Sequence, residues 1–512
     1  MKQKLPGSAG LLGMIVAGFA VLAFLFGSPG RAQERDAAVY VMIWFDTEDY
    51  ILPESNDAAK RLAVFLSERD IRGTFKLVGE KARMLQRLGR QDVIAALGKH
   101  EIGYHTNFHS QHPTPSEYLE QMEWEEGIDE FDRRERSGFQ LLRRMFGQKP
   151  TTYGQPGSSW APHYYGVLRR WGVGTYVDAF GQMGYKQKPF WYGGVLNIVH
   201  GSDAKVLRPN ADFSNLEESK NKFFSLYERR LAEGGGVISQ YYHPCEFVHA
   251  EFWDAVNFSK GANPPPAEWK IPPLLPPETS EAAFRHFEGL VEYMRTFPRV
   301  KFITASEALE LYRDGAQRRV FSRKELAEIA DQVDQEISFQ EYPNYTVAPS
   351  EVFALMTSFL AGQVREKAGQ PVTLSGTPFG PTKKAAALTA PLQVSWSQFF
   401  RTVLDVEEFL QKRKRVPSVV WFGSRAAPPA AYLRAAAEVA AGLLKGKDVP
   451  DIVEVQPARM TVGDEYVSEN NPDLWDWPIF PEGFTAPHLM ELGRLQAWTM
   501  KPAPLFFAAR KR

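Results

Sequence analysis

The sequence predicts an α/β protein in which a distorted (β/α) barrel is followed by a smaller, mostly helical domain that contains repeats. Short apolar runs rich in β-branched and aromatic residues alternate with helical patterns, which is typical of parallel β/α units. Polar residues follow several of these runs directly, as catalytic groups do at the carboxyl ends of barrel strands. A length of 512 residues also exceeds what one hydrophobic core usually organises.

The first strand is predicted over residues 39–45, a continuous apolar run of the kind that is buried on both faces of a sheet. This run ends directly on Asp46. Asn56 is expected to cap the following helix, and residues 73–78 are expected to return as the second strand.

The same alternation continues along the chain. Further helices are predicted over residues 92–97, 116–145 and 280–295, and further strands over residues 102–104, 173–177, 237–242 and 300–304. Prolines between residues 261 and 277 predict a long surface excursion. We therefore place a barrel domain at residues 33–315 and an accessory domain at residues 316–512.

An internal repeat is predicted in the accessory domain. Residues 399–400 and 416–420 recur 33 positions later as residues 432–433 and 449–453, and a looser copy includes residues 352–353 and 371–372. Each copy would be a helix leading into a Pro-Val strand, a unit that buries its apolar face only by stacking on its neighbours. Chance similarity among amphipathic helices is the alternative.

The amino terminus has the pattern of a signal peptide. Lys2 and Lys4 precede an apolar run over residues 11–27, and Gly30 and Ala32 are small residues placed where a signal peptidase would read them. We expect cleavage before Gln33, with an uncleaved anchor as the alternative. Either reading places the body of the protein in the periplasm or outside the cell.

The net charge and the cysteine content limit which binding partners are expected. Lys and Arg number 60 against 61 Asp and Glu, which gives a net charge of -1 and no pattern for binding nucleic acid. The single cysteine, Cys245, excludes an intramolecular disulfide, and no disulfide-linked partner is expected. We interpret Cys245 as a packed small hydrophobic residue.

Four polar residues fall at or just after predicted strand ends: Asp46, His105, Asp178 and His243. Because the carboxyl ends of parallel strands meet at one rim, these residues could share one site. His105 and His109 are spaced so that both imidazoles can ligate one ion. His100 and His112 lie nearby, so the spacing alone leaves open which pair is meant.

Residues 46–49 (Asp-Thr-Glu-Asp) place three carboxylates within four positions of one strand end. Buried together they would repel one another unless a cation or a proton absorbs the charge. A solvated turn is the alternative. With a carboxylate, the two histidines would form a three-ligand site that keeps open positions, which is the arrangement of a hydrolytic metal.

With these residues in these places, the sequence resembles the polysaccharide deacetylases with the NodB homology domain, carbohydrate esterase family four. The resemblance covers roughly residues 39–310. Its five motifs correspond to Phe45-Asp46-Thr47-Glu48-Asp49, His105-Thr106-Asn107-Phe108-His109, Tyr153-Gly154-Gln155-Pro156-Gly157, Tyr176-Val177-Asp178 and Tyr241-Tyr242-His243-Pro244. The order and spacing of these motifs are more specific than any one of them alone.

The resemblance implies a NodB-like barrel and a metal-dependent hydrolase that removes acetyl groups from an N-acetylated or O-acetylated extracellular or cell-wall polysaccharide. The metal would be divalent: zinc, with cobalt or manganese as alternatives. Its ligands would be Glu48, His105 and His109, although Asp49 could replace Glu48. Asp46 would be the general base, and His243 would protonate the leaving amine.

Two further residues are predicted to contact substrate. Trp160 lies among aromatic residues after the third motif and could stack on a sugar ring, or it could belong to the core. Asp178 belongs to the fourth motif. Peptidoglycan, chitin-like and exopolysaccharide substrates all fit the resemblance.

The sequence departs from the family at its third motif, where Gly154 stands in place of an arginine that orients the basic Asp. Another basic group could reach in, Gln155 could supply a weaker hydrogen bond, or the domain could bind glycan without cleaving it. A glycoside hydrolase on a related barrel is the other alternative.

The carboxyl-terminal repeats resemble pseudomurein-binding repeats weakly, over residues 399–420 and 432–453. That resemblance would imply attachment to a cell-wall glycan. A structural interaction domain is the alternative.

Overall fold

A computed structural model describes residues 37–179, 181–199, 215–364 and 371–506. The signal peptide predicted over residues 1–32 lies outside these ranges. Within them, no helix is both long enough and apolar enough to cross a membrane.

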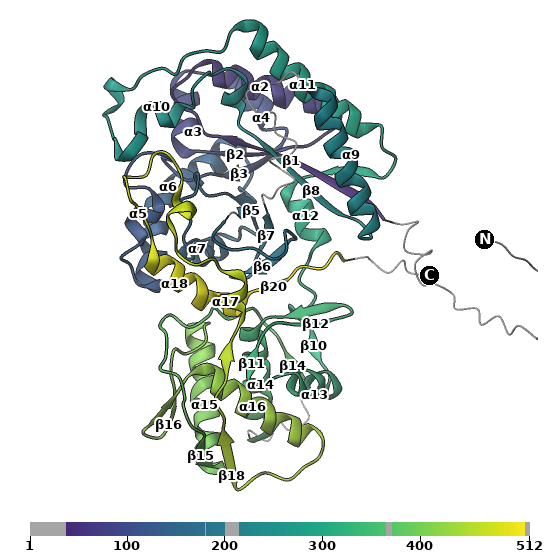
Figure 1. The fold of residues 1–512 in the computed structure, drawn as a ribbon, viewed down its shortest axis with the longest axis vertical. Helices are drawn as coiled ribbons and strands as arrows, with labels where there is room; N and C mark the ends of the chain where they lie inside the picture. Colours follow the sequence, from purple (N-terminus) through teal and green to yellow (C-terminus); the bar gives the residue numbers. More distant parts are fainter. Residues whose placement is uncertain (1–36, 180, 200–214, 365–370, 507–512) are drawn as a thin grey trace, which may run out of the picture.

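The first part of the chain, with one strand from near its end, forms a curled, mainly parallel sheet wrapped by helices (Figure 1). The strand order is β20-β6-β7-β5-β4-β3-β2-β1-β8, and β9 also pairs with β1. The strands are β1 (Val39–Thr47), β2 (Thr74–Leu77), β3 (Glu101–Tyr104), β4 (Thr152–Tyr153), β5 (Thr175–Ala179), β6 (Phe190–Tyr192), β7 (Val195–Val199), β8 (Gly236–Tyr242), β9 (Val300–Ile303) and β20 (Lys501–Pro502). This architecture confirms the predicted distorted (β/α) barrel.

Strand β1 is the centre of this sheet. Its first residues pair with both β8 and β9, and its last residues pair with β2 and β8, all in parallel. Every residue of β1 is buried except the half-buried Tyr40. Burial on both faces is what a continuous apolar run predicts, and it delivers Asp46 and Glu48 to the carboxyl rim of the sheet.

The barrel helices include the predicted ones, two of which need correction, and several that were not predicted. They are α2 (Glu54–Ser67), α3 (Gly79–Arg87), α4 (Gln91–Leu97), α5 (Pro115–Leu119), α6 (Trp124–Phe146), α7 (His163–Trp171), α9 (Leu216–Ala232), α10 (Trp253–Phe258), α11 (Pro277–Arg295) and α12 (Ala305–Leu311). The prediction that Asn56 caps α2 is wrong. The helix begins earlier because Pro53, whose φ is fixed near the helical value, stands at its start, and Asn56 is buried inside it.

The helix predicted over residues 116–145 is divided into α5 and α6. Between them the Glu120 carboxylate accepts the backbone N–H groups of His488 and Leu489, at 3.0 and 3.2 Å. Because these donors come from the far end of the chain, local sequence could not predict the break.

The end of the chain returns to the barrel. After the second unit, residues 462–503 run through α17 (Val462–Tyr466) and α18 (Pro487–Gln496) to β20, which pairs antiparallel with β6. Apolar residues of this segment, including Leu489 and Met490, belong to the same core as the barrel strands. We call residues 462–503 the return segment; the domain boundary at residue 315 stays a prediction.

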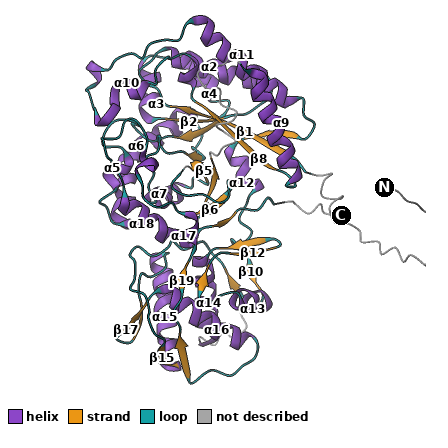
Figure 2. Cartoon of the chain, in the orientation of Figure 1, coloured by secondary structure: helices purple, strands orange, loops and turns teal. Residues whose placement is uncertain are grey.

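The second unit, mostly helical in Figure 2, has its own core. It contains two copies of one arrangement: a strand, a helix, a two-stranded hairpin, a second helix and a last strand. In each copy the first and last strands pair antiparallel. The first copy is β10 (Val320–Phe321), α13 (Arg323–Asp331), β12 (Gln340–Tyr342), β13 (Tyr345–Val347), α14 (Pro349–Val364) and β14 (Val372–Thr373). The second copy is β15 (Leu392–Ser395), α15 (Trp396–Arg413), β16 (Val420–Phe422), β17 (Arg425–Ala427), α16 (Pro429–Leu444) and β18 (Ile452–Val455).

The structural repeat differs from the predicted one in its length. Pro349 and Pro429 begin corresponding helices, so the copies are offset by 429 − 349 = 80 residues. The predicted 33-residue period relates α15 to α16, which are two helices of the same copy. The residues at 352–353 and 432–433, predicted as separate small units, occupy matching positions of the two copies.

Lys501 is expected to be essential for stability. Its ammonium lies 2.7 Å from Glu351 Oε2 and 2.7 Å from Asp314 Oδ2, and all three side chains are buried. Lys501→Ala leaves two buried carboxylates without their cation, so we expect the free energy of unfolding to fall by about 3 to 5 kcal/mol. Urea titration measures the loss. Lys445→Ala, which removes an exposed pair with Asp331, should cost less than about 1 kcal/mol, and equal losses would contradict the prediction.

Candidate metal centre

Three strand ends bring the predicted catalytic residues together. Asp46 and Glu48 lie at the end of β1, His105 follows β3, and His243 follows β8. The side chains of Asp46, Glu48 and His105 are at most 4 % exposed, whereas that of His243 is 13 % exposed. The site is therefore closed on the β1 and β3 sides and reaches solvent at His243.

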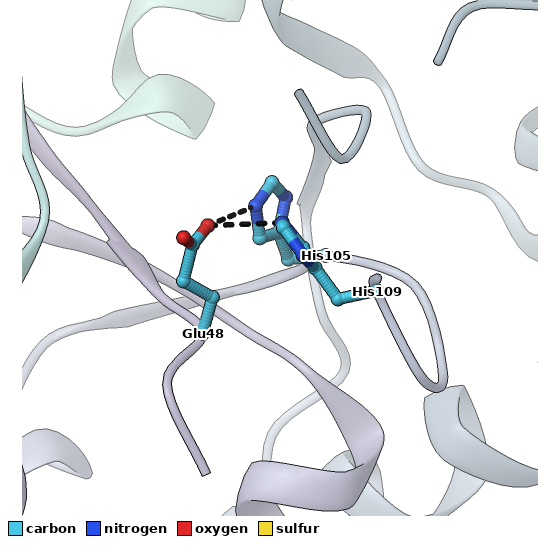
Figure 3. A group of neighbouring side chains, drawn as sticks. All are labelled: Glu48, His105 and His109. Carbon is cyan, nitrogen blue, oxygen red and sulfur yellow. Dashed lines mark hydrogen bonds and ion pairs between the residues drawn. The ribbon is translucent and has the colours of Figure 1, made fainter. Parts of the chain in front are cut away.

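Glu48, His105 and His109 form a group whose ligand atoms could hold one metal ion. Figure 3 shows both imidazoles directed at the Glu48 carboxylate. His105 Nε2 lies 3.1 Å and His109 Nε2 3.0 Å from Glu48 Oε2. Burial alone would raise the pKa of Glu48, but the neighbouring imidazoles, His109 first, hold it well below the ordinary value.

Contacts at Nδ1 fix both imidazoles with Nε2 facing inward. His105 Nδ1 lies 3.0 Å from the carbonyl oxygen of Gly154, and His109 Nδ1 lies 2.6 Å from Ser110 Oγ. Such contacts leave Nε2 available as a ligand atom. Among the described residues, His109 Nε2 has no partner with hydrogen-bond geometry, although it is completely buried. A buried nitrogen in this position fits a metal ligand.

The turn that carries the two histidines is strained. Thr106 and His109 have φ values of 64° and 56°, in the left-handed region that residues with a Cβ rarely adopt. The Thr106 hydroxyl accepts the backbone N–H of His109 at 3.2 Å and so helps to hold this conformation. Strain of this kind persists where the surrounding structure fixes the backbone, often at functional sites.

Asp49, the alternative ligand, has another role in this structure. Its Oδ1 accepts the backbone N–H groups of Ile51 and Leu52 at 2.8 and 3.0 Å, and the Lys81 ammonium contacts its carbonyl oxygen. Burial raises the pKa of Asp49 to about 6. It also lies close to Cys245 and His249 in a second group with ligand atoms, but the nearby Lys81 ammonium disfavours a further cation there.

Asp46 is paired with a residue that the sequence analysis did not single out. Lys76 Nζ lies 2.7 Å from Asp46 Oδ1, and both side chains are buried. Burial alone would raise the pKa of Asp46, but the charges of His105, Lys76 and His243 outweigh it and lower the pKa. A lysine inside an otherwise apolar strand was the available signal, since lysine is almost never fully buried without a partner.

His243 faces both carboxylates of β1 from the open side of the site. Its Nε2 lies 3.7 Å from Asp46 Oδ2 and 3.8 Å from Glu48 Oε2. Its Nδ1 lies 3.4 Å from Glu246 Oε2. An imidazole set between carboxylates and partly open to solvent is placed to donate a proton to a bound molecule.

A second layer of residues supports the ligands. The indole of Trp253 donates to Glu48 Oε1 at 3.0 Å. From His109, contacts continue through the Ser110 hydroxyl to Asp254 Oδ2 at 3.3 Å, which also accepts the indole N–H of Trp477 at 3.0 Å. Trp477 belongs to the return segment, so the far end of the chain reaches a candidate ligand. The sequence offered no signal for Trp253, Asp254 and Trp477 because they lie about 140 to 370 residues from the histidines.

The two predicted substrate residues are placed as follows. Trp160 is completely buried, and its ring packs against Gly493 of the return segment. This placement fits the alternative given in the sequence analysis, in which Trp160 belongs to the core. Its role in substrate binding stays a prediction. The side chain of Asp178, in β5, lies outside the described part of the structure, and its role stays a prediction as well.

Comparison with known proteins gives matches in structure alone. The chain matches no protein-family model and no curated protein. Solved structures that are similar include a probable polysaccharide deacetylase from Pseudomonas aeruginosa PAO1, with 14 % identity, a TM-score of 0.38, and coverage of 54 % of this chain and 91 % of that one.

Two other similar structures have different descriptions. One is the allantoinase PuuE, with 14 % identity, a TM-score of 0.38, and coverage of 58 % of this chain and 97 % of that one. The other is a pseudoenzyme of carbohydrate esterase family four from Bacillus anthracis, with 13 % identity, a TM-score of 0.27, and coverage of 52 % and 63 %. The matches thus include the family whose motifs the sequence resembles, and nothing in them supports the resemblance to pseudomurein-binding repeats.

Proposed function

We propose that this chain is a metal-dependent deacetylase of the polysaccharide deacetylase family, acting on an N-acetylated or O-acetylated extracellular or cell-wall polysaccharide. One observation carries the proposal. A carboxylate, Asp46, lies beside a buried group of two imidazoles and one carboxylate, and His243 faces the same group from the open side.

The donor atoms suit a divalent transition metal. Two imidazole nitrogens and one carboxylate oxygen are a ligand set that zinc uses in catalytic sites, where open positions remain for water and substrate. Cobalt or manganese would accept the same set. Glu48, His105 and His109 would hold the ion, and contacts to Gly154 and Ser110 support both imidazoles from behind.

The residues around the site divide the chemistry of amide hydrolysis between them. A bound divalent ion would polarise the acetyl carbonyl and lower the pKa of a water molecule. Asp46 would accept the proton that this water loses as it attacks the carbonyl carbon. When the carbon–nitrogen bond breaks, His243 would give a proton to the departing amine, so that acetate and a free amino sugar leave the site.

Localisation and partners follow from sequence as proposals. We propose that residues 1–32 direct export and that the protein acts in the periplasm or outside the cell. The near-neutral charge fits a glycan partner that is not a polyanion, and nucleic acid is not a proposed partner. The second unit is proposed to be an accessory domain.

Two measurements on the purified full chain test the function: metal content by mass spectrometry, and acetate release from N-acetylated oligosaccharides with and without a chelator. We expect one divalent ion per chain and acetate release that the chelator stops. Metal without acetate would instead indicate a glycan-binding protein, and release of reducing sugar would indicate a glycoside hydrolase.

A further inference from the structure

Lys76 lies where the side chain of residue 154 would begin. A Cβ atom built on Gly154 would lie 1.9 Å from Lys76 Nζ and 2.8 Å from Lys76 Cδ. No side chain at position 154 can coexist with this lysine in its present conformation. The position at which the family has an arginine is therefore filled by a cation that comes from another strand.

We propose that Lys76 is the positioning residue that holds the Asp46 carboxylate for proton abstraction, and that residue 154 is glycine to leave room for it. The inference rests on the proposed function. It also accounts for the departure at the third motif, since a cation still contacts the basic carboxylate and only its origin in the chain has changed.

The sheet register explains how Lys76 reaches this place. Asp46 lies opposite Lys76 in the β1–β2 pair, and Lys76 lies opposite Gly103 in the β2–β3 pair. A Cβ atom built on Gly103 would lie 2.8 Å from Lys76 Cγ. The stem of the lysine thus crosses β3 at one glycine and ends at a second, Gly154, just after β4.

The surroundings of the ammonium fix its position. Nζ lies 2.7 Å from Asp46 Oδ1, 3.4 Å from the carbonyl oxygen of Val177, and 4.3 Å from the centre of the Trp44 ring. The Lys76 side chain is completely buried. A buried ammonium needs such partners, and an attractive charge at hydrogen-bond distance restrains the carboxylate that it contacts.

Four variants test the proposal: Lys76→Met, Lys76→Ala, Gly154→Arg and the double variant Lys76→Ala/Gly154→Arg. Lys76→Met keeps most of the stem of the side chain and removes the ammonium with its charge, so we expect kcat to fall by about 10²-fold because the base loses its fixed position, with KM and metal content unchanged. Gly154→Arg alone should also be harmful, because its side chain collides with Lys76. In Lys76→Ala/Gly154→Arg the arginine has space, so kcat should recover above that of Lys76→Ala alone.

Lys501→Met is the matched control. It removes the charge of another buried lysine that pairs with carboxylates away from the site, so it should lower thermal stability and leave the kcat of the folded protein unchanged. Lys76→Met with unchanged kcat, or a double variant no better than Lys76→Ala, would overturn the proposal.

Crystal structures of Lys76→Met and the double variant give a readout that does not depend on acetate. The Asp46 carboxylate should leave its position in the first and return to it in the second. If the unmodified chain releases no acetate while these movements occur, the proposed function fails and the positioning role stands. If Asp46 keeps its position in Lys76→Met, the positioning role fails whatever the activity.

Discussion

Asp46→Asn is expected to keep its metal ion and to release acetate about 10² to 10⁴ times more slowly, the range that loss of a general base costs. The asparagine side chain has nearly the same shape as the carboxylate that it replaces, but its amide cannot accept the proton of an attacking water. Because Asp46 is not one of the three proposed ligands, the metal content should stay at that of the unmodified protein. Acetate release and mass spectrometry of the same preparation test both statements.

Asp49→Asn is the matched control for this variant. Asp49 is three residues away, is also buried, and uses one side-chain oxygen to accept two backbone N–H groups. Asparagine keeps such an oxygen, so metal content and acetate release should both be preserved. Loss of metal in Asp49→Asn would make Asp49 a ligand, and activity retained in Asp46→Asn would remove Asp46 from the role of base.

The sequence predicted those parts of the fold that depend on local pattern. The run of residues 39–45 predicted a strand buried on both faces, and the structure has β1 in this place, with Asp46 at its end. The Gly-Thr-Phe-Lys-Leu-Val run predicted β2. Such patterns work because periodicity and residue type report burial directly.

The sequence could not predict contacts made across long distances in the chain. At the break between α5 and α6, Glu120 accepts backbone N–H groups near residue 488, and the return segment adds β20 to the barrel sheet. The 80-residue repeat was also missed, because its copies share an order of elements and few identical residues. In each case the two interacting or corresponding segments lie far apart in the chain, and no local sequence pattern connects them.

The candidate site shows the same division. The spacing of His105 and His109 and the strand end before Asp46 were readable, because each is a local feature. The pairing of Asp46 with Lys76 was not, because it depends on the register of neighbouring strands and on two glycines that leave space. The absence of the arginine was visible in the sequence, whereas Lys76 could be identified as its replacement only from the structure.

His109→Ala is expected to weaken metal affinity by more than about 10²-fold. Loss of a residue that only hydrogen-bonds to a metal ligand already weakens affinity about 10- to 100-fold, and this change removes the ligand atom itself. Acetate release should fall with the metal content and return in part when zinc is added in excess. Mass spectrometry after dialysis and a titration with a competing chelator measure the affinity.

His112→Ala separates loss of a ligand from loss of a neighbouring histidine. His112 Nδ1 lies 2.7 Å from Glu117 Oε2, and its Nε2 lies 3.3 Å from the carbonyl oxygen of Phe258, so both ring nitrogens are already engaged away from Glu48. This variant should therefore keep its metal. If both variants keep it, His109 is not a ligand and the buried Nε2 needs another explanation; if both lose it, the turn as a whole, and not one nitrogen, holds the ion.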